Sequence, residues 1–249
     1  MLKKHEYCTA LILKKEKKMF IFIYNKNKMK SNSMHIILDC GHGMNDTTKG
    51  KYSPLLDPSE FNLRDVTVYE NRFREGNFNR LIGQRLERML KEAGFAVHVV
   101  SDSYNDTSLK DRVKKANEIA NKYGKDECIY VSIHSNAAGN GVDWNNASGA
   151  SVHCARKCSE RSKKLARLIY KHVLENGYDG NRSVPEDHIW YNDFFVLQNT
   201  KMPAVLVENL FYDNKNDLKK LMSDEHRDVI VSYLYHGILE FIVEGNYIK

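Results

Sequence analysis

The chain has 249 residues and a formal net charge of +6. Nine lysines and two glutamates give the first 30 residues a charge of +7, and the rest of the chain, with 29 basic and 30 acidic side chains, carries −1. A chain-wide basic surface that binds nucleic acid is therefore excluded. An apolar fraction of 42% is enough for a sizeable core and too high for a disordered chain.

Residues 1–33 are rich in lysine and asparagine and show no hydrophobic period. We expect them to form a disordered leader, and Met34 is an alternative start directly before the first predicted strand. The apolar stretches of this leader are interrupted by residues 14–18, so no convincing signal peptide is present and a cytoplasmic protein is expected. No apolar run approaches the roughly 18 residues of a membrane span.

From residue 34 onward, short apolar runs alternate with segments of helical spacing. The predicted strands are 35–39, 95–100, 128–133, 150–155, 194–197 and 204–207. The predicted helices are 78–90, 109–123, 159–175, 216–222 and 226–243, and polar loops fill 44–73, 135–149 and 177–193. This alternation predicts one α/β domain over residues 34–249, with a mostly parallel twisted sheet of about six strands flanked by helices.

The five cysteines of the chain are an odd number and are scattered. They argue against a disulfide framework and indicate a reducing compartment. The segment 153–158 contains His153, Cys154 and Cys158 but lacks a second ligand pair at zinc-finger spacing. We interpret it as a core cysteine followed by the start of a helix.

Polar residues at predicted strand ends are the candidates for chemistry, because open α/β sheets bind ligands beyond the carboxyl ends of their strands. His42, His134 and Glu208 each follow a predicted strand, and Glu75 opens the helix 78–90. A lone histidine is more often a structural residue, but two histidines with one carboxylate are a common ligand set for catalytic zinc. A further carboxylate serves as the general base in such sites. The combination therefore indicates a metal-dependent hydrolase.

The residues around the two histidines fit this interpretation. Gly41 and Gly43 allow a tight turn at His42. Ligating histidines usually donate their second ring nitrogen to a fixed acceptor. We expect Asp39 to supply that acceptor in the first loop, and Ser135 or Asn136 to supply it near His134.

Four segments carry a resemblance to a known family. They are LDCGHG at 38–43, EGNFN at 75–79, SIHSN at 132–136 and PAVLVE at 203–208. In this order they resemble the motifs of the zinc-dependent N-acetylmuramoyl-L-alanine amidases, and the resemblance covers residues 35–243. The chain departs from the family pattern at Cys40, where a proline is usual, and at Asn209 and Leu210, where small residues are common. We expect Cys40 to be tolerated and the pocket edge near Asn209 to differ.

The resemblance implies that His42, Glu75 and His134 bind one Zn²⁺ ion and that Glu208 is the catalytic carboxylate. Glu70 competes with Glu75 as second ligand, and Glu75 is preferred because Asn79 follows it at the spacing of the family motif. Asn79 is expected to support this site.

The resemblance implies that Asn136 and Asn209 also support the site, and we predict that Asn136, Arg182 and Asn209 bind the substrate. Arg182 suits a stem-peptide carboxylate because its guanidinium is planar, although a solvated loop arginine is an equally good interpretation. Trp190, Tyr191 and the loop 135–149 are expected to line the groove.

The implied reaction is hydrolysis of the amide bond between N-acetylmuramic acid and L-alanine in peptidoglycan, as in autolysins and endolysins. The expected partner is peptidoglycan, with no nucleic acid and no membrane span, and the protein is expected to be a monomer. Without an export signal, we expect it to reach the cell wall through cell lysis or a holin-type pore.

Two other functions remain open on sequence grounds. A carboxypeptidase-type zinc metallopeptidase normally has a glutamate three residues after its first histidine, where this chain has Asn45. A non-catalytic peptidoglycan-binding relative would be expected to lose a ligand or Glu208. Convergence of His42, Glu75 and His134 on one metal position is the geometric test of an enzyme.

Overall fold

The computed structural model describes residues 34–247, so the predicted leader 1–33 lies outside the described residues. The strands are β1 (His35–Cys40), β2 (Val68–Tyr69), β3 (Arg72–Phe73), β4 (Ala96–Val99), β5 (Cys128–Asn136), β6 (Ser151–Cys154), β7 (Trp190–Tyr191) and β8 (Ala204–Phe211). The helices are α3 (Glu75–Glu92), α4 (Leu109–Tyr123), α5 (Glu160–Glu175), α6 (Phe195–Asn199), α7 (Lys215–Leu221) and α8 (Asp224–Tyr247), with a 3₁₀ turn at Lys125–Glu127.

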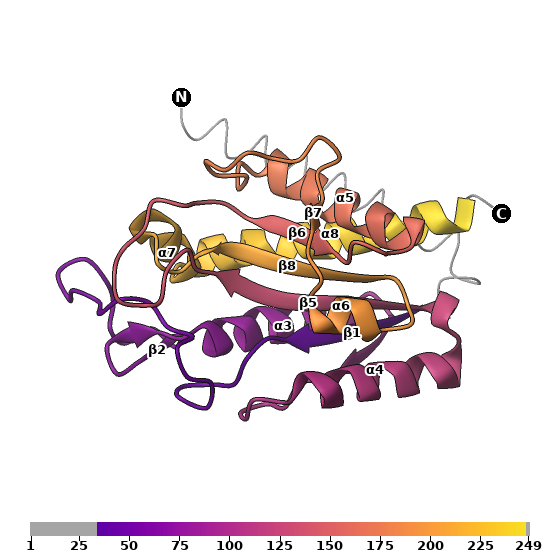
Figure 1. The fold of residues 1–249 in the computed structure, drawn as a ribbon, viewed down its shortest axis with the longest axis horizontal. Helices are drawn as coiled ribbons and strands as arrows, with labels where there is room; N and C mark the ends of the chain where they lie inside the picture. The colour runs from indigo at the N-terminus through magenta and orange to yellow at the C-terminus, as the bar shows by residue number, and fades with distance from the viewer. Residues whose placement is uncertain (1–33, 248–249) are drawn as a thin grey trace.

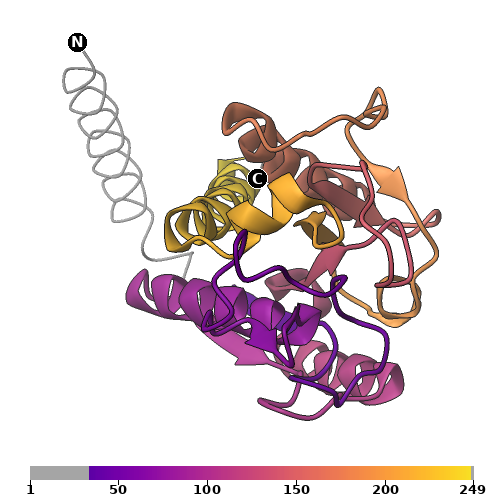
Figure 2. The same cartoon turned by 90° about the vertical axis from the view of Figure 1, so that its left-hand side faces the viewer.

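Six strands form one sheet in the order β4-β1-β5-β8-β6-β7. All neighbouring pairs are parallel except β6 and β8, which pair antiparallel. Helices α3, α5 and α8 pack on one face, and α4 and α6 pack on the other (Figures 1 and 2). The predicted fold class, a mostly parallel six-stranded sheet flanked by helices, is confirmed.

The central strands are apolar on both faces because helices cover both. In β1, Ile36 and Leu38 join the core beneath α3, α5 and α8, while Ile37 joins the core beneath α4 and α6. Helix α4 begins at the N-cap Ser108, whose side chain accepts a hydrogen bond from the Asp111 N–H. In the centre of the sheet, the strands and helices of the structure therefore agree with the hydrophobic pattern of the sequence.

One predicted strand is wrong. Residues 195–197 belong to the short helix α6 and Phe194 is its N-cap, whose carbonyl accepts hydrogen bonds from the N–H groups of Leu197 and Gln198. The adjacent residues Val196 and Leu197 are both buried, so burial alone does not separate a helix from a strand covered on both faces, and the hydrogen bonds decide for the helix. The sixth strand is instead β7, inside the predicted loop 177–193.

The predicted excursion 44–73 contains the two-stranded hairpin of β2 and β3. An isolated antiparallel bridge joins Tyr52 to Arg74, directly before α3. This pairing fixes the segment against the start of α3, where the predicted second ligand lies. Within residues 34–247, no helix is both long and apolar enough to cross a membrane.

Candidate active site

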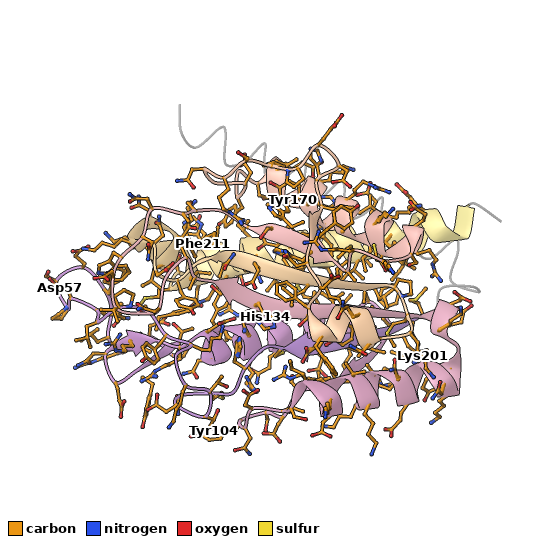
Figure 3. The ribbon with its side chains drawn as sticks, in the orientation of Figure 1. Asp57, Tyr104, His134, Tyr170, Lys201 and Phe211 are labelled. Carbon is orange, nitrogen blue, oxygen red and sulfur yellow. The ribbon has the colours of Figure 1, made fainter. Side chains whose placement is uncertain are left out.

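The predicted ligands lie together because β1, β5 and β8 run parallel and end at the same edge of the sheet. His42 follows β1 by two residues, His134 lies near the end of β5, and Glu75 is the first residue of α3. One ligand atom from each of these three residues lies within 4.8 Å of the others. His134 is labelled near the centre of the molecule in Figure 3. Within residues 34–247, this is the one group of three or more potential metal ligands.

Glu75 is the centre of this group and is only 2% exposed. Its Oε2 lies 3.4 Å from Nε2 of His42, and its Oε1 lies 3.0 Å from Nδ1 of His134. Oε1 also accepts hydrogen bonds from the Ser135 N–H (3.2 Å) and from Nδ2 of Asn79 (3.4 Å). The hydrogen bond from Asn79 to Glu75 therefore agrees with the predicted support of the site by Asn79.

Glu70, the competing ligand, lies elsewhere. Its carboxylate is 61% exposed and pairs with Arg74 at 3.3 Å. It is not part of the group formed by His42, Glu75 and His134. The geometry favours Glu75.

The protonation of the group suits cation binding, because metals bind neutral imidazoles and ionised carboxylates. Burial lowers the pKa of His42 to about 4, so this ring is neutral at pH 7. Burial would raise the pKa of Glu75, but His42, His134 and Lys51 together lower it, so the carboxylate is ionised. The pKa of His134 is raised, because its contact with Glu75 outweighs the opposing effect of burial. A bound cation would take over the role of that extra proton.

The loop that carries His42 is held by the end of β5, which carries His134, and by helix α3. A Cβ at Gly41 would overlap the His134 ring, so the two loops approach as closely as they do because residue 41 is glycine. Asn79 donates to the Gly41 carbonyl (3.1 Å), and Arg80 donates to the His42 carbonyl (2.5 Å). His42 itself has φ 59°, a left-handed conformation that costs energy for a residue with a Cβ.

The predicted partners of the histidine rings are wrong. Asp39 points to the α4 side of the sheet, where it accepts hydrogen bonds from Tyr130 (2.6 Å) and Ser132 (3.0 Å) and pairs with Arg112. The Ser135 hydroxyl donates to the Asn209 carbonyl, and the Asn136 side chain accepts from the Ala137 N–H. These side chains brace the strands that carry the ligands rather than the rings.

Glu208 lies directly opposite His134 in the register of β5 and β8. Its Oε2 is buried and has no hydrogen-bond partner within the described chain. Burial raises the pKa of Glu208 to about 7; His134 opposes this shift and Glu75 adds to it. A carboxyl with this pKa exchanges a proton near neutral pH, as a general base requires.

A cavity of about 480 Å³ opens beside this group on the α4 and α6 side of the sheet. His42, His134 and Glu208 line it together with Lys51, and its outer wall is built from residues 107–109 and 194–196. A substrate bound in this cavity would therefore meet the two predicted histidine ligands and the predicted base together. Lys51 was missed from the sequence, because nothing in its local pattern shows that residues 51–53 pair with residues 73–75.

The predicted substrate-binding residues lie around this core. The Arg182 guanidinium packs on the rings of Phe211 (4.8 Å) and Trp190 (5.4 Å), and its Nη2 donates to the Gly149 carbonyl. Asn209 is fully buried and donates to the His134 carbonyl at 2.7 Å. Neither residue lines the 480 Å³ cavity. A substrate contact of either stays a prediction.

The other predicted groove residues have contacts outside the cavity as well. Tyr191 donates its hydroxyl to Asp187 (2.7 Å), and the Trp190 ring packs on the ring of Tyr170 (5.1 Å). Asn136 is half-buried at the end of β5. Their contact with substrate likewise stays a prediction.

A family model described as N-acetylmuramoyl-L-alanine amidase matches residues 36–240. The chain belongs to this family. The match includes all four motifs on which the resemblance was based, and it excludes the carboxypeptidase-type alternative.

Individual relatives agree with the family. An endolysin of Bacillus phage SPP1 is 30% identical over 149 residues, which are 59% of this chain and 50% of the endolysin. The amidase LytC of Bacillus subtilis is 29% identical over 189 residues, which are 75% of this chain and 34% of LytC. The chain thus spans half or less of the length of these two relatives.

Solved structures of amidases have the same fold. An N-acetylmuramoyl-L-alanine amidase from Clostridium difficile 630 superposes with a TM-score of 0.66 at 26% identity and covers 85% of this chain and 97% of its own. The catalytic domain of CwlV from Bacillus (Paenibacillus) polymyxa gives a TM-score of 0.62 at 24% identity and covers 84% of this chain and 98% of its own. The described residues therefore correspond to nearly the whole of a solved catalytic domain.

Proposed function

We propose that this chain is a zinc-dependent N-acetylmuramoyl-L-alanine amidase that hydrolyses the amide bond between N-acetylmuramic acid and L-alanine in peptidoglycan. In this proposal His42, Glu75 and His134 hold one Zn²⁺ ion and Glu208 is the catalytic base. The observation that carries it is the convergence of the three ligand atoms, within 4.8 Å of one another, beside a cavity that His42, His134 and Glu208 line.

The donor set fits zinc. Two imidazoles and one carboxylate are a usual protein ligand set for catalytic zinc and leave a position open. When bound, zinc would supply Lewis-acid polarisation and would lower the pKa of a coordinated water from about 15.7 towards about 7. Glu75, already ionised, balances part of the charge of the ion.

The remaining chemistry belongs to side chains of this protein. Glu208 accepts a proton from the attacking water and delivers it to the amide nitrogen as the carbon–nitrogen bond breaks. The products are the lactyl carboxylate of the sugar and the free amine of L-alanine. The orphaned Oε2 of Glu208 is available for this role because no other group in the described chain engages it.

The test is the release of free L-alanine N-termini from purified peptidoglycan, with zinc measured by mass spectrometry in the same preparation. We expect chelator-sensitive activity in the wild type and a loss of about 10²- to 10⁴-fold in Glu208→Gln, with the zinc content unchanged. Glu70→Gln is the matched control and should keep full activity. Full activity of Glu208→Gln would refute the assigned role, and a wild type that binds peptidoglycan without cleaving it would favour the non-catalytic alternative.

The proposal extends to the setting in which the enzyme acts. Similarity to a phage endolysin supports action on the cell wall after release by cell lysis. We propose that the enzyme acts as a monomer and binds no nucleic acid. Sedimentation would show the oligomeric state, and the protein in the medium of intact, unlysed cells would contradict release by lysis.

A further inference from the structure

Lys51 is a cation at the active site to which no role has yet been given. Its Nζ lies 4.0 Å from Oε2 of Glu75, and its side chain is 42% exposed. It lines the 480 Å³ cavity with His42, His134 and Glu208. Its charge also acts on Glu208, whose pKa it lowers against the larger effect of burial.

The backbone fixes this lysine opposite the start of α3. The Glu75 N–H donates to the Lys51 carbonyl at 3.1 Å. The next residue, Tyr52, forms the antiparallel bridge with Arg74, and the Ser53 N–H donates to the Phe73 carbonyl at 3.0 Å. Paired main chain therefore holds Lys51 next to the start of α3, and its side chain lines the cavity.

The other basic groups near the site are already engaged. Arg112 also lines the cavity, but it donates to Asp39, to Asp106 (2.9 Å) and to the carbonyls of Cys40 (2.8 Å) and Thr107 (2.7 Å). Arg182 packs on two aromatic rings outside the cavity lining. Within the described chain, Lys51 is thus the cavity-lining cation with N–H donors left for a substrate.

We propose that the Lys51 ammonium donates a hydrogen bond to the carbonyl oxygen of the scissile amide and stabilises the negative charge that develops there. The inference rests on the proposed amidase function. As water adds to the carbonyl carbon, the carbonyl electron pair moves to the oxygen, and a cation beside that oxygen stabilises the transition state more than the ground state. Lys51 lies next to Glu75, one of the three proposed metal ligands, and the proposal therefore assigns it to the reacting amide rather than to the distal part of a stem peptide.

The experiment compares Lys51→Met and Lys51→Arg with Lys49→Met, an exposed lysine of the same loop. Two soluble probes are used: N-acetylmuramoyl-L-alanyl-D-isoglutamine and the same compound with D-glutamate, which adds a carboxylate. We expect kcat of Lys51→Met to fall about 100-fold on both probes while KM changes by less than about threefold. Lys51→Arg should keep more activity than Lys51→Met, and Lys49→Met should match the wild type.

Two readouts do not depend on turnover. Zinc content should be the same in Lys51→Met as in the wild type. In a Glu208→Gln background, calorimetric binding of either probe should change by less than about threefold when Lys51 is replaced, because the contact strengthens only as charge develops.

Each other result has a definite meaning. Loss of zinc in Lys51→Met would make Lys51 a support of Glu75 and overturn the inference. A loss confined to the D-glutamate probe would show that Lys51 binds the added carboxylate, and this would also overturn the inference. A kcat equal to that of the wild type would overturn it as well. A zinc-loaded wild type that cleaves neither the probes nor peptidoglycan would instead overturn the proposed function, and the inference with it.

Discussion

The buried pair of Arg112 and Asp39 offers a stability test of how the site is braced. Arg112 is 2% exposed, and Asp39 is 1% exposed. In Arg112→Met, Asp39 would keep its bonds from Tyr130 and Ser132 but lose its charged partner. The carbonyls of Cys40 and Thr107 would lose a donor as well.

Removal of one partner of a buried ion pair typically costs about 3–5 kcal/mol, because the other charge is left uncompensated. For a domain of this size, 1 kcal/mol corresponds to about 2–4 °C in Tm, so a fall of about 6–20 °C is expected. The measurement is urea denaturation of the metal-free protein, with thermal melting as a second readout. Zinc affinity should fall too, because Cys40 lies two residues before His42.

The matched control is Arg156→Met. Arg156 is 68% exposed and pairs with Asp193 at 3.4 Å, so its loss should cost about 1 kcal/mol or less. The double variant Asp39→Asn/Arg112→Met should lose less than the sum of the two single variants, because the buried charge is gone. Equal costs for Arg112→Met and Arg156→Met, or strict additivity of the double variant, would refute the reasoning.

Three further predictions concern the same region. A Cβ at Gly83 would overlap the Cys40 sulfur, so Gly83→Ala should lower the free energy of unfolding by about 1–3 kcal/mol in urea denaturation. Adding Cys40→Ala should restore most of the lost stability, and a double variant without this rescue would contradict the packing. Zinc at about 1,000 times its Kd should stabilise the wild type by about 4 kcal/mol, and it should stabilise His134→Ala much less. An equal zinc-induced rise in Tm for both proteins would argue against His134 as a ligand. Metal-free Glu208 has a pKa of about 7 against an ordinary 4.5. The folded state therefore holds this proton more tightly, and stability should fall as pH rises from about 4.5 to about 7. Glu208→Gln should lack this component in denaturation curves across that range, and an identical pH slope would contradict it.

The strand-end argument picked out candidate residues because the carboxyl ends of parallel strands lie at one edge of a sheet. His42, His134 and Glu208 follow three apolar runs, and the structure places β1, β5 and β8 side by side in the sheet. Sequence order alone does not give this neighbourhood, since β6 and β7 come before β8 in the chain and lie beyond it in the sheet. The family resemblance supplied what the strand-end argument lacked, namely that these ends meet.

The misassigned segment 194–197 shows the limit of periodicity. A run of four apolar residues is too short for its pattern to distinguish a strand from one turn of helix. Its outcome depends on tertiary contacts, where Val196 and Leu197 pack into the core beneath α4 and α6. The two-residue strand β7 has still less pattern, because its pairing with β6 alone defines it.

Asp39 shows why the supporting contacts could not be read from spacing. A residue three positions before His42 is close enough in sequence to orient its ring, but alternation along β1 turns residue 39 to the same face as Ile37. There it meets Arg112 of α4, while α3 holds the same loop from the opposite face through Asn79. The centre at the strand ends thus depends on both helical layers. A substitution of Arg112 or Asn79 should therefore alter metal binding although neither residue is a proposed ligand. This effect depends on tertiary contacts, so it could not be predicted from the sequence.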